Sequence, residues 1–317
     1  ILPITRQLWL VSGEACSALR FSWGSRSEEG CLSSMWALDV DCDGFPLSTT
    51  GGYVWDAARH LASFLEVAGD RFGLLRPGVR ILELGAGCGW LGLTIARNVE
   101  TVAEICMTEQ VEGDGLRWLN HNVEKAKANG VPIGDRVTTA ACDWTWYTKT
   151  TPHGAQDHGE DNARPEQEKL AEFAESGLDT HGVVGPVDES EALARIQQDA
   201  NAKAQGIRHI AETSWDLVIG SDLVYNSTGV EMLPVVLREL TKNQTTEVLY
   251  CHTRYRLELC DIDFLEQLRL NGLHCREVRV PGAPSPPPSP PPLTELFPDK
   301  RMAVYHITAG AETGAEQ

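Results

Sequence analysis

A short stretch of the chain, Val79–Leu93, decides the fold class, and its sequence is VRILELGAGCGWLGL. Its first six residues form a short apolar run that is typical of a buried parallel strand. Alternating glycines follow directly, and the apolar spacing from Trp90 predicts a helix as far as Asn98. A strand, a glycine turn and a helix in this order are typical of the nucleoside-binding edge of an open α/β sheet.

Strand-like and helix-like segments continue to alternate on both sides of this stretch. The predicted strands are Glu104–Thr108, Val137–Ala141, Trp215–Gly220, Glu247–Thr253, Leu273–Val280 and Met302–Thr308. The predicted helices are Tyr53–Val67, Leu116–Ala128, Leu233–Leu240 and Phe264–Asn271. The chain is therefore expected to form an α/β domain with a largely parallel sheet.

The domain is expected to span residues 48–310, after an N-terminal extension at 1–47 in which short strands are an option. An acidic insert at 147–212 interrupts it, and its composition favours partial disorder or a helical lobe with helices at Pro165–Ser176 and Glu189–Ala204. Residues 281–292 form a proline-rich loop that cannot join a sheet. Residues 311–317 are expected to be a disordered tail.

Composition narrows the class of protein. The 317 residues include 27 basic and 45 acidic side chains, a formal net charge of −18. Because such a chain repels phosphate backbones, we expect no sequence-independent binding of nucleic acid. No apolar run reaches the roughly 18 to 20 residues of a membrane helix, so no membrane association is expected.

The nine cysteines form no CxxC pair, and no cluster of Cys and His has the spacing of a zinc site. Buried thiols in a reducing compartment are therefore expected, and no metal. This favours a cytoplasmic protein, with the nucleus as the alternative.

Two acids indicate the ligand of the glycine turn. A dinucleotide site needs G-x-G-x-x-G, but residues 85–89 form G-x-G-x-G and follow Glu83 closely. A carboxylate there disfavours a pyrophosphate and favours a cationic ligand. Glu109 ends the second strand, where an acid can accept hydrogen bonds from ribose hydroxyls. S-adenosylmethionine is cationic and has no phosphate, so we predict it as the cofactor, with NAD as the alternative.

Several segments resemble known motifs. Residues 83–93 resemble motif I of the seven-β-strand (class I) methyltransferases. Thr50–Ala58 (TGGYVWDAA) resembles the G-x-x-x-W-x-A segment of methyltransferase family 16, which comprises lysine methyltransferases that act on non-histone proteins. Four more matches to that family are Thr108-Glu109, Leu119–Asn122, Cys142–Trp144 and Asp216–Tyr225, the last with its Asp-x-x-Tyr signature. The resemblance covers about residues 48–145 and 213–280.

The resemblance implies a Rossmann-like sheet of seven strands, mostly parallel with an antiparallel terminal strand, and helices on both faces. The cofactor-binding residues that it implies are Trp55, Glu83, Gly85, Gly87, Gly89, Glu109, Asp143, Trp144 and Ser221. Simpler roles stay open for some of them: turn geometry for the glycines, helix capping for Asp143 and a core position for Trp55.

Asp222 and Tyr225 are the predicted catalytic residues, since they follow the carboxyl end of a central strand. Asp222 is expected to orient the substrate amine or accept its proton, and Tyr225 to line the channel; capping of the next segment is the alternative for Asp222. His252 and Arg254, at the end of the fifth strand, are further candidates for facing the substrate.

The predicted function is methyl transfer to a lysine amine of a non-histone protein. The alternatives are another acceptor, such as a small molecule or protein N-terminus, and a catalytically silent binding module. The resemblance implies translation factors and chaperones as partners, and a monomer is expected.

Overall fold

The computed structural model describes residues 36, 38–42, 50–148, 189–254, 258–280 and 301–310. All of them belong to one of two units of the chain, Ser33–Gln317. The predicted helix Pro165–Ser176, the proline-rich loop and the tail lie outside the described residues, as does most of the 1–47 extension.

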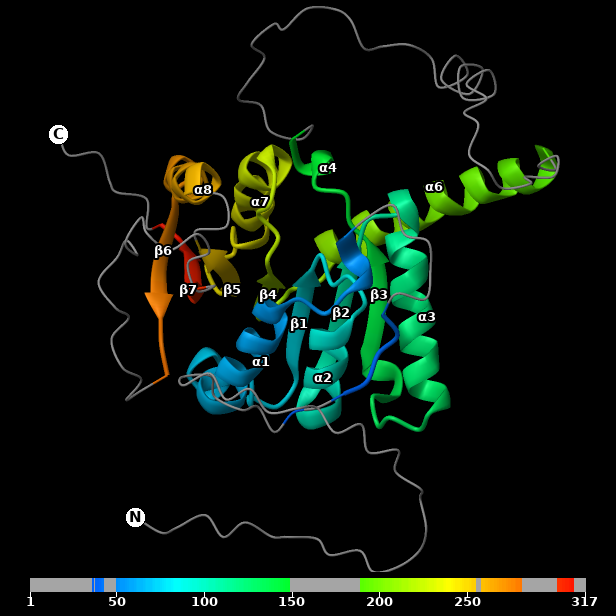
Figure 1. Ribbon diagram of the computed structural model, residues 1–317, viewed down its shortest axis with the longest axis horizontal. Coiled ribbons are helices and arrows are strands. Elements are labelled where there is room, and N and C mark those ends of the chain that lie inside the picture. The colour runs from blue at the N-terminus through cyan, green and yellow to red at the C-terminus, as the bar shows by residue number, and fades with distance from the viewer. Residues whose placement is uncertain are drawn as a thin grey trace, which may run out of the picture. The chain divides into compact units, whose positions relative to one another are not determined.

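Seven strands form one sheet in the order β3-β2-β1-β4-β5-β7-β6 (Figure 1). The strands are β1 Val79–Leu84, β2 Val102–Glu109, β3 Val137–Ala141, β4 Leu217–Ser221, β5 Glu247–Arg254, β6 Leu273–Val278 and β7 Arg301–Ala309. Strands β1 to β5 pair in parallel, whereas β7 is antiparallel to both β5 and β6. The predicted seven-stranded, mostly parallel sheet with an antiparallel last strand is confirmed.

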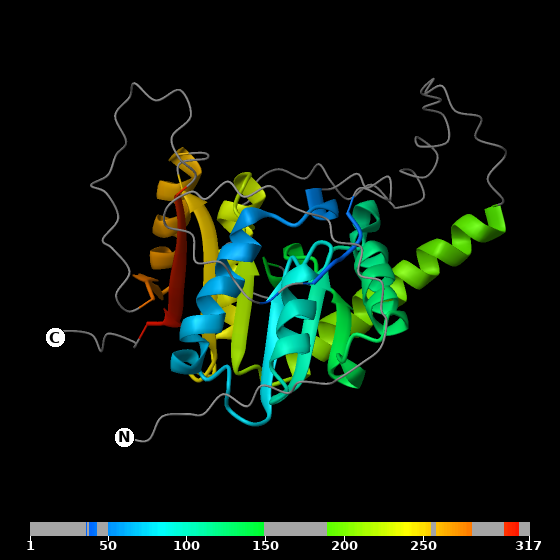
Figure 2. The same ribbon diagram turned by 60° about the horizontal axis from the view of Figure 1, so that its bottom comes forward.

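Helices cover both faces of this sheet (Figure 2). One face is packed by α1 Asp56–Ala68, α2 Trp90–Asn98 and α3 Gly115–Ala128, and the other by α6 Glu189–Glu212, α7 Ser227–Leu240 and α8 Glu258–Leu270. Short helical segments are η1 Thr50–Gly52, η2 Gly69–Phe72, η3 Glu112–Asp114, η4 Gly134–Arg136 and α4 Thr145–Thr148. Within these ranges, no helix is long and apolar enough to cross a membrane.

The alternation of side chains along β1 explains why both faces need a cover. Ile81 packs into the layer of α1, α2 and α3, whereas Leu82 and Leu84 pack into the opposite layer. All three side chains are at most 1% exposed. A strand buried on both faces has an almost continuous apolar sequence, as the stretch at Val79–Leu84 does.

Helix α6 is longer than the predicted helix Glu189–Ala204, and its last residues belong to the core. Ile210 is 2% exposed and packs with Trp215 beneath the sheet. A Cβ atom at Gly206 would overlap the Ala141 carbonyl, so a glycine is needed where α6 crosses β3. The prediction of the helix end at Ala204 was wrong because the turns beyond it are held by packing on the sheet.

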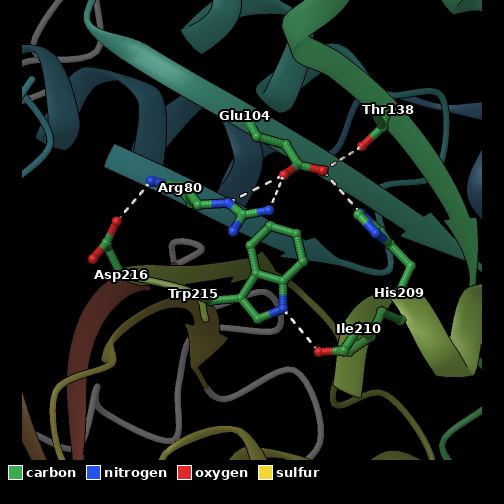
Figure 3. A network of polar contacts seen from close by, with 7 residues as sticks. All are labelled: Arg80, Glu104, Thr138, His209, Ile210, Trp215 and Asp216. Atoms are coloured by element: carbon green, nitrogen blue, oxygen red, sulfur yellow. Dashed lines mark hydrogen bonds and ion pairs between the residues drawn. The ribbon is translucent and has the colours of Figure 1, made fainter. Parts of the chain in front are cut away.

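A cluster of polar contacts ties the end of α6 to the amino ends of the strands (Figure 3). The Glu104 carboxylate accepts hydrogen bonds from the Arg80 guanidinium and the Thr138 hydroxyl, and His209 of α6 contacts it at 2.8 Å. The Arg80 guanidinium also lies 5.6 Å from the ring centre of Trp215. Since these residues come from β1, β2, β3 and α6, the cluster joins segments that are far apart in the sequence.

Candidate active site

A cavity of about 340 Å³ opens at the carboxyl ends of β1 and β4, where the strand order reverses. Its lining comes from η1 and α1, the turns after β1, β2 and β3, and the segment after β4. Open α/β sheets bind their ligands at this topological switch point. Of the eleven predicted site residues, ten line the cavity: Trp55, Glu83, Gly85, Gly87, Glu109, Asp143, Trp144, Ser221, Asp222 and Tyr225.

Gly89 is the exception. It lies outside the lining and precedes the first residue of α2 with φ +79°. A Cβ atom there would lie 2.6 Å from Leu119 Cδ1, so Gly89 allows α2 to leave the turn beside α3. Turn geometry, rather than ligand contact, explains this glycine.

In the turn between β1 and α2, two positions exclude nearly every residue type except glycine. Gly85 and Gly87 both have φ +57°, in the left-handed region that other residues rarely adopt. A Cβ atom at Gly87 would lie 2.9 Å from the Gly51 carbonyl oxygen, and one at Gly85 would lie 2.5 Å from Leu223. The backbone of these two glycines therefore forms part of the cavity lining.

Glu109 connects the end of β2 to this turn. Its Oε2 accepts the backbone N–H of Gly87 at 2.9 Å, and its Oε1 accepts that of Gln110 at 3.0 Å. Burial raises the pKa of the carboxyl above its usual value, although the two N–H groups oppose this. Each oxygen keeps a further lone pair that can accept a ligand hydroxyl.

Glu83 lies on the floor of the cavity and is 3% exposed. Burial raises its pKa to about 8, the N–H of Gly92 opposes this in part, and the nearby Glu109 raises it further. Its buried Oε2 accepts no hydrogen bond from the described part of the chain. A buried carboxyl oxygen without a hydrogen-bond partner is costly, so this carboxyl fits a ligand that brings a cation.

Asp143 and Trp144 follow β3. The Oδ1 of Asp143 accepts both the N–H and the hydroxyl of Thr145 at 2.9 Å, which caps the short helix α4. Asp143 therefore does cap a helix, and it also lines the cavity. Trp144 is half-buried, with its ring edge 4.0 Å from the position of a Cβ atom on Gly85.

Trp55 is the residue before α1 and belongs to the rim of the cavity rather than to the core. It is 37% exposed, and its indole N–H donates to the Thr50 carbonyl at 3.2 Å. Tyr53 and Tyr225 line the same cavity and are 57% and 43% exposed. These three are the aromatic residues among the large apolar side chains that the described segments expose.

Asp222 follows the end of β4 and is 7% exposed. Its Oδ1 accepts the backbone N–H of Thr253, and its Oδ2 accepts the Thr253 hydroxyl, both at 2.8 Å. With φ +51°, Asp222 has a left-handed backbone that is uncommon outside glycine. The two hydrogen bonds from Thr253 therefore fix its carboxylate to β5, where it lines the cavity beside Ser221.

The other two polar candidates lie elsewhere. His252 is 3% exposed and its ring contacts Tyr250 and Asp261, whereas Arg254 forms an ion pair with Glu277 at 3.2 Å. Neither lines the cavity. Their positions on β5 therefore do not make them substrate-facing residues.

Comparison with known families decides the assignment. The family described as lysine methyltransferase matches residues 40–158 and 195–271, which is more than half of the chain. The chain belongs to the lysine methyltransferase family. The match includes every residue that was predicted for the site.

Solved methyltransferases are similar in fold. A methyltransferase from Pyrococcus furiosus is 14% identical with a TM-score of 0.39, over 84% of this chain and 87% of that one. Fibrillarin from Aeropyrum pernix, solved with natively bound S-adenosyl-L-methionine, is 12% identical with a TM-score of 0.41, over 80% of this chain and 76% of that one. Among curated proteins, no sequence matches significantly. The family assignment rests on the sequence match.

As a member of this family, the protein is an S-adenosylmethionine-dependent methyltransferase. The cavity fits that cofactor: the glycine turn leaves room for a close backbone approach, and the buried Glu83 carboxyl, whose Oε2 has no hydrogen-bond partner among the described residues, suits a cation. The predicted cofactor is confirmed, and the alternative of NAD is not needed.

Sequence reasoning missed part of the lining. Gln110, Asn226 and Thr228 also border the cavity. Asn226 had a readable signal: its side chain accepts the N–H of Gly229 at 2.8 Å and starts α7 at Ser227, ahead of the predicted start at Leu233. Asn is a preferred N-cap residue, because its side chain accepts the N–H of the second or third residue of the helix. Gln110 has no comparable signal.

Proposed function

We propose that this methyltransferase transfers the methyl group of S-adenosylmethionine to the side-chain amine of a lysine in a non-histone protein. The observation on which this rests is the rim of the cavity. Tyr53, Trp55 and Tyr225 expose their rings there, around a cavity that also contains the Asp222 carboxylate. Aromatic faces attract cations, and a carboxylate adds a hydrogen-bond acceptor, so the site suits an amine.

The chain's own residues account for binding of the donor. Glu83 would hold the ammonium group of the cofactor, and Glu109 would hold its ribose hydroxyls. The turn at Gly85 and Gly87 leaves room for its aminoacyl part. When bound, S-adenosylmethionine supplies an electrophilic methyl carbon attached to a sulfonium. No residue of the chain then has to form a covalent intermediate.

The amine must be neutral before it can attack carbon. Asp222 lines the cavity, where its carboxylate can accept a hydrogen bond from the amine or take its proton. A like charge nearby, such as the sulfonium of the bound cofactor, disfavours the ammonium form of the amine. Alignment of the amine with the methyl group supplies most of the acceleration in such a site.

The net charge of −18 supports a partner with a basic surface. Opposite charge raises the rate of encounter at low salt. Lysine-rich surfaces of translation factors and chaperones fit this requirement, and we propose proteins of these kinds as substrates. We further propose that the protein is monomeric, acts in the cytoplasm and has no nucleic-acid partner.

The test is incubation of the purified protein with labelled S-adenosylmethionine and a cell extract, with Asp222→Asn as the matched control. We expect label in protein bands, and mass spectrometry should place methyl groups on lysine ε-nitrogen atoms. Label in RNA, in small molecules or on protein N-termini would refute the lysine assignment. Cofactor binding without any labelled product would support the silent-module alternative.

A further inference from the structure

The segment after β4 is held in place by backbone and side-chain hydrogen bonds with β5. Ser221 pairs with Cys251, and the backbone N–H of Asp222 donates to the Cys251 carbonyl at 2.9 Å. Thr253 holds the Asp222 carboxylate, as described above. A left-handed, non-glycine residue such as Asp222 persists only where its surroundings determine it strongly.

The next two residues of the segment are held by one buried hydroxyl. Tyr250 is 2% exposed, and its oxygen accepts the backbone N–H groups of Leu223 and Val224, both at 3.1 Å. Burial, with a smaller contribution from Asp222, raises the pKa of Tyr250 well above its usual value, so the hydroxyl keeps its proton. Two accepted hydrogen bonds use both lone pairs, and the proton must then point elsewhere.

The neighbour placed to receive that proton is His252. Its Nδ1 lies 3.1 Å from the Tyr250 oxygen and is placed to accept the proton. The tautomer therefore has its own proton on Nε2, which donates to Asp261 Oδ1 at 2.6 Å. We call this series of hydrogen bonds, which links Tyr250, His252 and Asp261, the row. Because backbone N–H groups can only donate, the N–H groups of the segment after β4 fix the direction of every hydrogen bond in the row.

The row runs from α8 through β5 to the segment that contains the predicted catalytic residues. Asp261 lies on α8, its side chain is 18% exposed, and that of His252 is 4% exposed. None of Asp261, His252 and Tyr250 lines the cavity. They can act on the reaction only through the backbone that they hold.

We propose that Tyr250, His252 and Asp261 are positioning residues that fix residues 222–225 in the geometry needed for methyl transfer. The inference rests on the proposed role of Asp222 and Tyr225. It predicts that loss of the row lowers turnover and leaves the cofactor site, on β1 and β2, intact. A purely structural role predicts that stability changes and that kcat of the folded protein does not.

Three variants test this. Tyr250→Phe removes the acceptor for the two N–H groups, and His252→Leu removes the acceptor for the tyrosine proton at similar volume. His252→Asn keeps an oxygen near the position of Nδ1. With S-adenosylmethionine and the identified protein substrate, Tyr250→Phe and His252→Leu should lower kcat about tenfold or more, since small misplacements are costly. Cofactor Kd should stay within about twofold, and His252→Asn should recover most of kcat.

Asp261→Asn tests the proposal where a substitution of Tyr250 or His252 prevents folding, because it leaves the packing of the core unchanged. The kcat of this variant should also fall. Glu277→Gln, which removes the ion pairs with Arg254 and Arg279 outside the cavity, is the control and should retain wild-type kcat. Unchanged kcat in folded Tyr250→Phe and Asp261→Asn would overturn the proposal. So would equal kcat for His252→Asn and His252→Leu. A fully active Asp222→Asn would instead refute the proposed role of Asp222, which separates the two failures.

Discussion

The carboxylate of Glu109 accepts the backbone N–H of Gly87 at 2.9 Å, and so links the acid at the end of β2 to the glycine turn at the end of β1. This contact explains why the glycines and the acid occur together in the sequence. The turn needs a positive φ at Gly87, and the carboxylate holds that turn open beside the cavity. One residue therefore shapes the cofactor site and also offers oxygens to the ribose.

Gly87→Ala should weaken binding of S-adenosylmethionine more than tenfold. The new Cβ atom would lie 2.9 Å from the Gly51 carbonyl, and a positive φ costs alanine about 1–2 kcal/mol. Gly130→Ala is the matched control, because Gly130 has φ +72° and no atom within 4 Å of a Cβ position. Calorimetry measures the cofactor affinity of both variants. Equal affinities would contradict a role of the glycine turn in cofactor binding.

Glu83→Gln should remove a pH dependence of cofactor binding. With a pKa of about 8, the Glu83 carboxyl is mostly protonated at neutral pH, and a bound ammonium favours its ionised form. Binding to the wild type should therefore release protons and tighten as pH rises towards 8. The amine of the cofactor titrates with both proteins, so the difference between their pH profiles isolates Glu83. Parallel profiles would show that Glu83 does not sense the ligand.

Asp222→Asn should bind the cofactor normally and lower turnover by about 100-fold, which is the range for loss of a group that handles a proton. Asparagine tolerates the left-handed backbone at this position, whereas alanine would add strain. Steady-state kinetics with the labelled cofactor give kcat, and calorimetry gives Kd. Wild-type turnover in this variant would remove Asp222 from the mechanism.

Glu104→Gln should destabilise the fold by about 1.5–3 kcal/mol, the usual range for hydrogen bonds to a charged group. Burial raises the pKa of Glu104, but Arg80 and His209 outweigh it and hold the pKa below its usual value. The stabilisation is therefore present above the ordinary carboxyl pKa and is lost as pH falls through the lowered one. Urea unfolding at neutral and acidic pH measures this, with exposed Glu100→Gln as the control. A difference that does not shrink in acid would point to packing rather than charge.

The sequence predicts best where local patterns are continuous. Strand β1 and helix α2 have the predicted bounds because an apolar run, a glycine turn and helical spacing follow one another without a gap. The end of α6 was missed because Gly206 and Ile210 are placed by contact with β3 and the sheet. Such tertiary contacts leave no periodic signal in the segment itself.

In the candidate site, too, residues that a local pattern places were predicted, and residues that tertiary contacts place were not. Residues at strand ends, such as Glu109 and Asp222, were predictable because the carboxyl ends of parallel strands meet at one edge. The role of Tyr250 was not, since it depends on which residues of β4 and β5 lie side by side. His252 was placed in the correct strand, but the pattern could not tell that its ring points away from the cavity.

Calorimetric titration of the wild type and Glu109→Ala with S-adenosylmethionine tests the central claim most directly. The wild type should bind one cofactor per chain, and Glu109→Ala should bind it about 1–3 kcal/mol more weakly because hydrogen bonds to a charged acceptor are lost. Glu112→Ala, which changes an acid that pairs with Lys203 outside the cavity, should bind like the wild type. A wild-type protein that gives no binding heat, or a Glu109→Ala variant with unchanged affinity, would contradict the account.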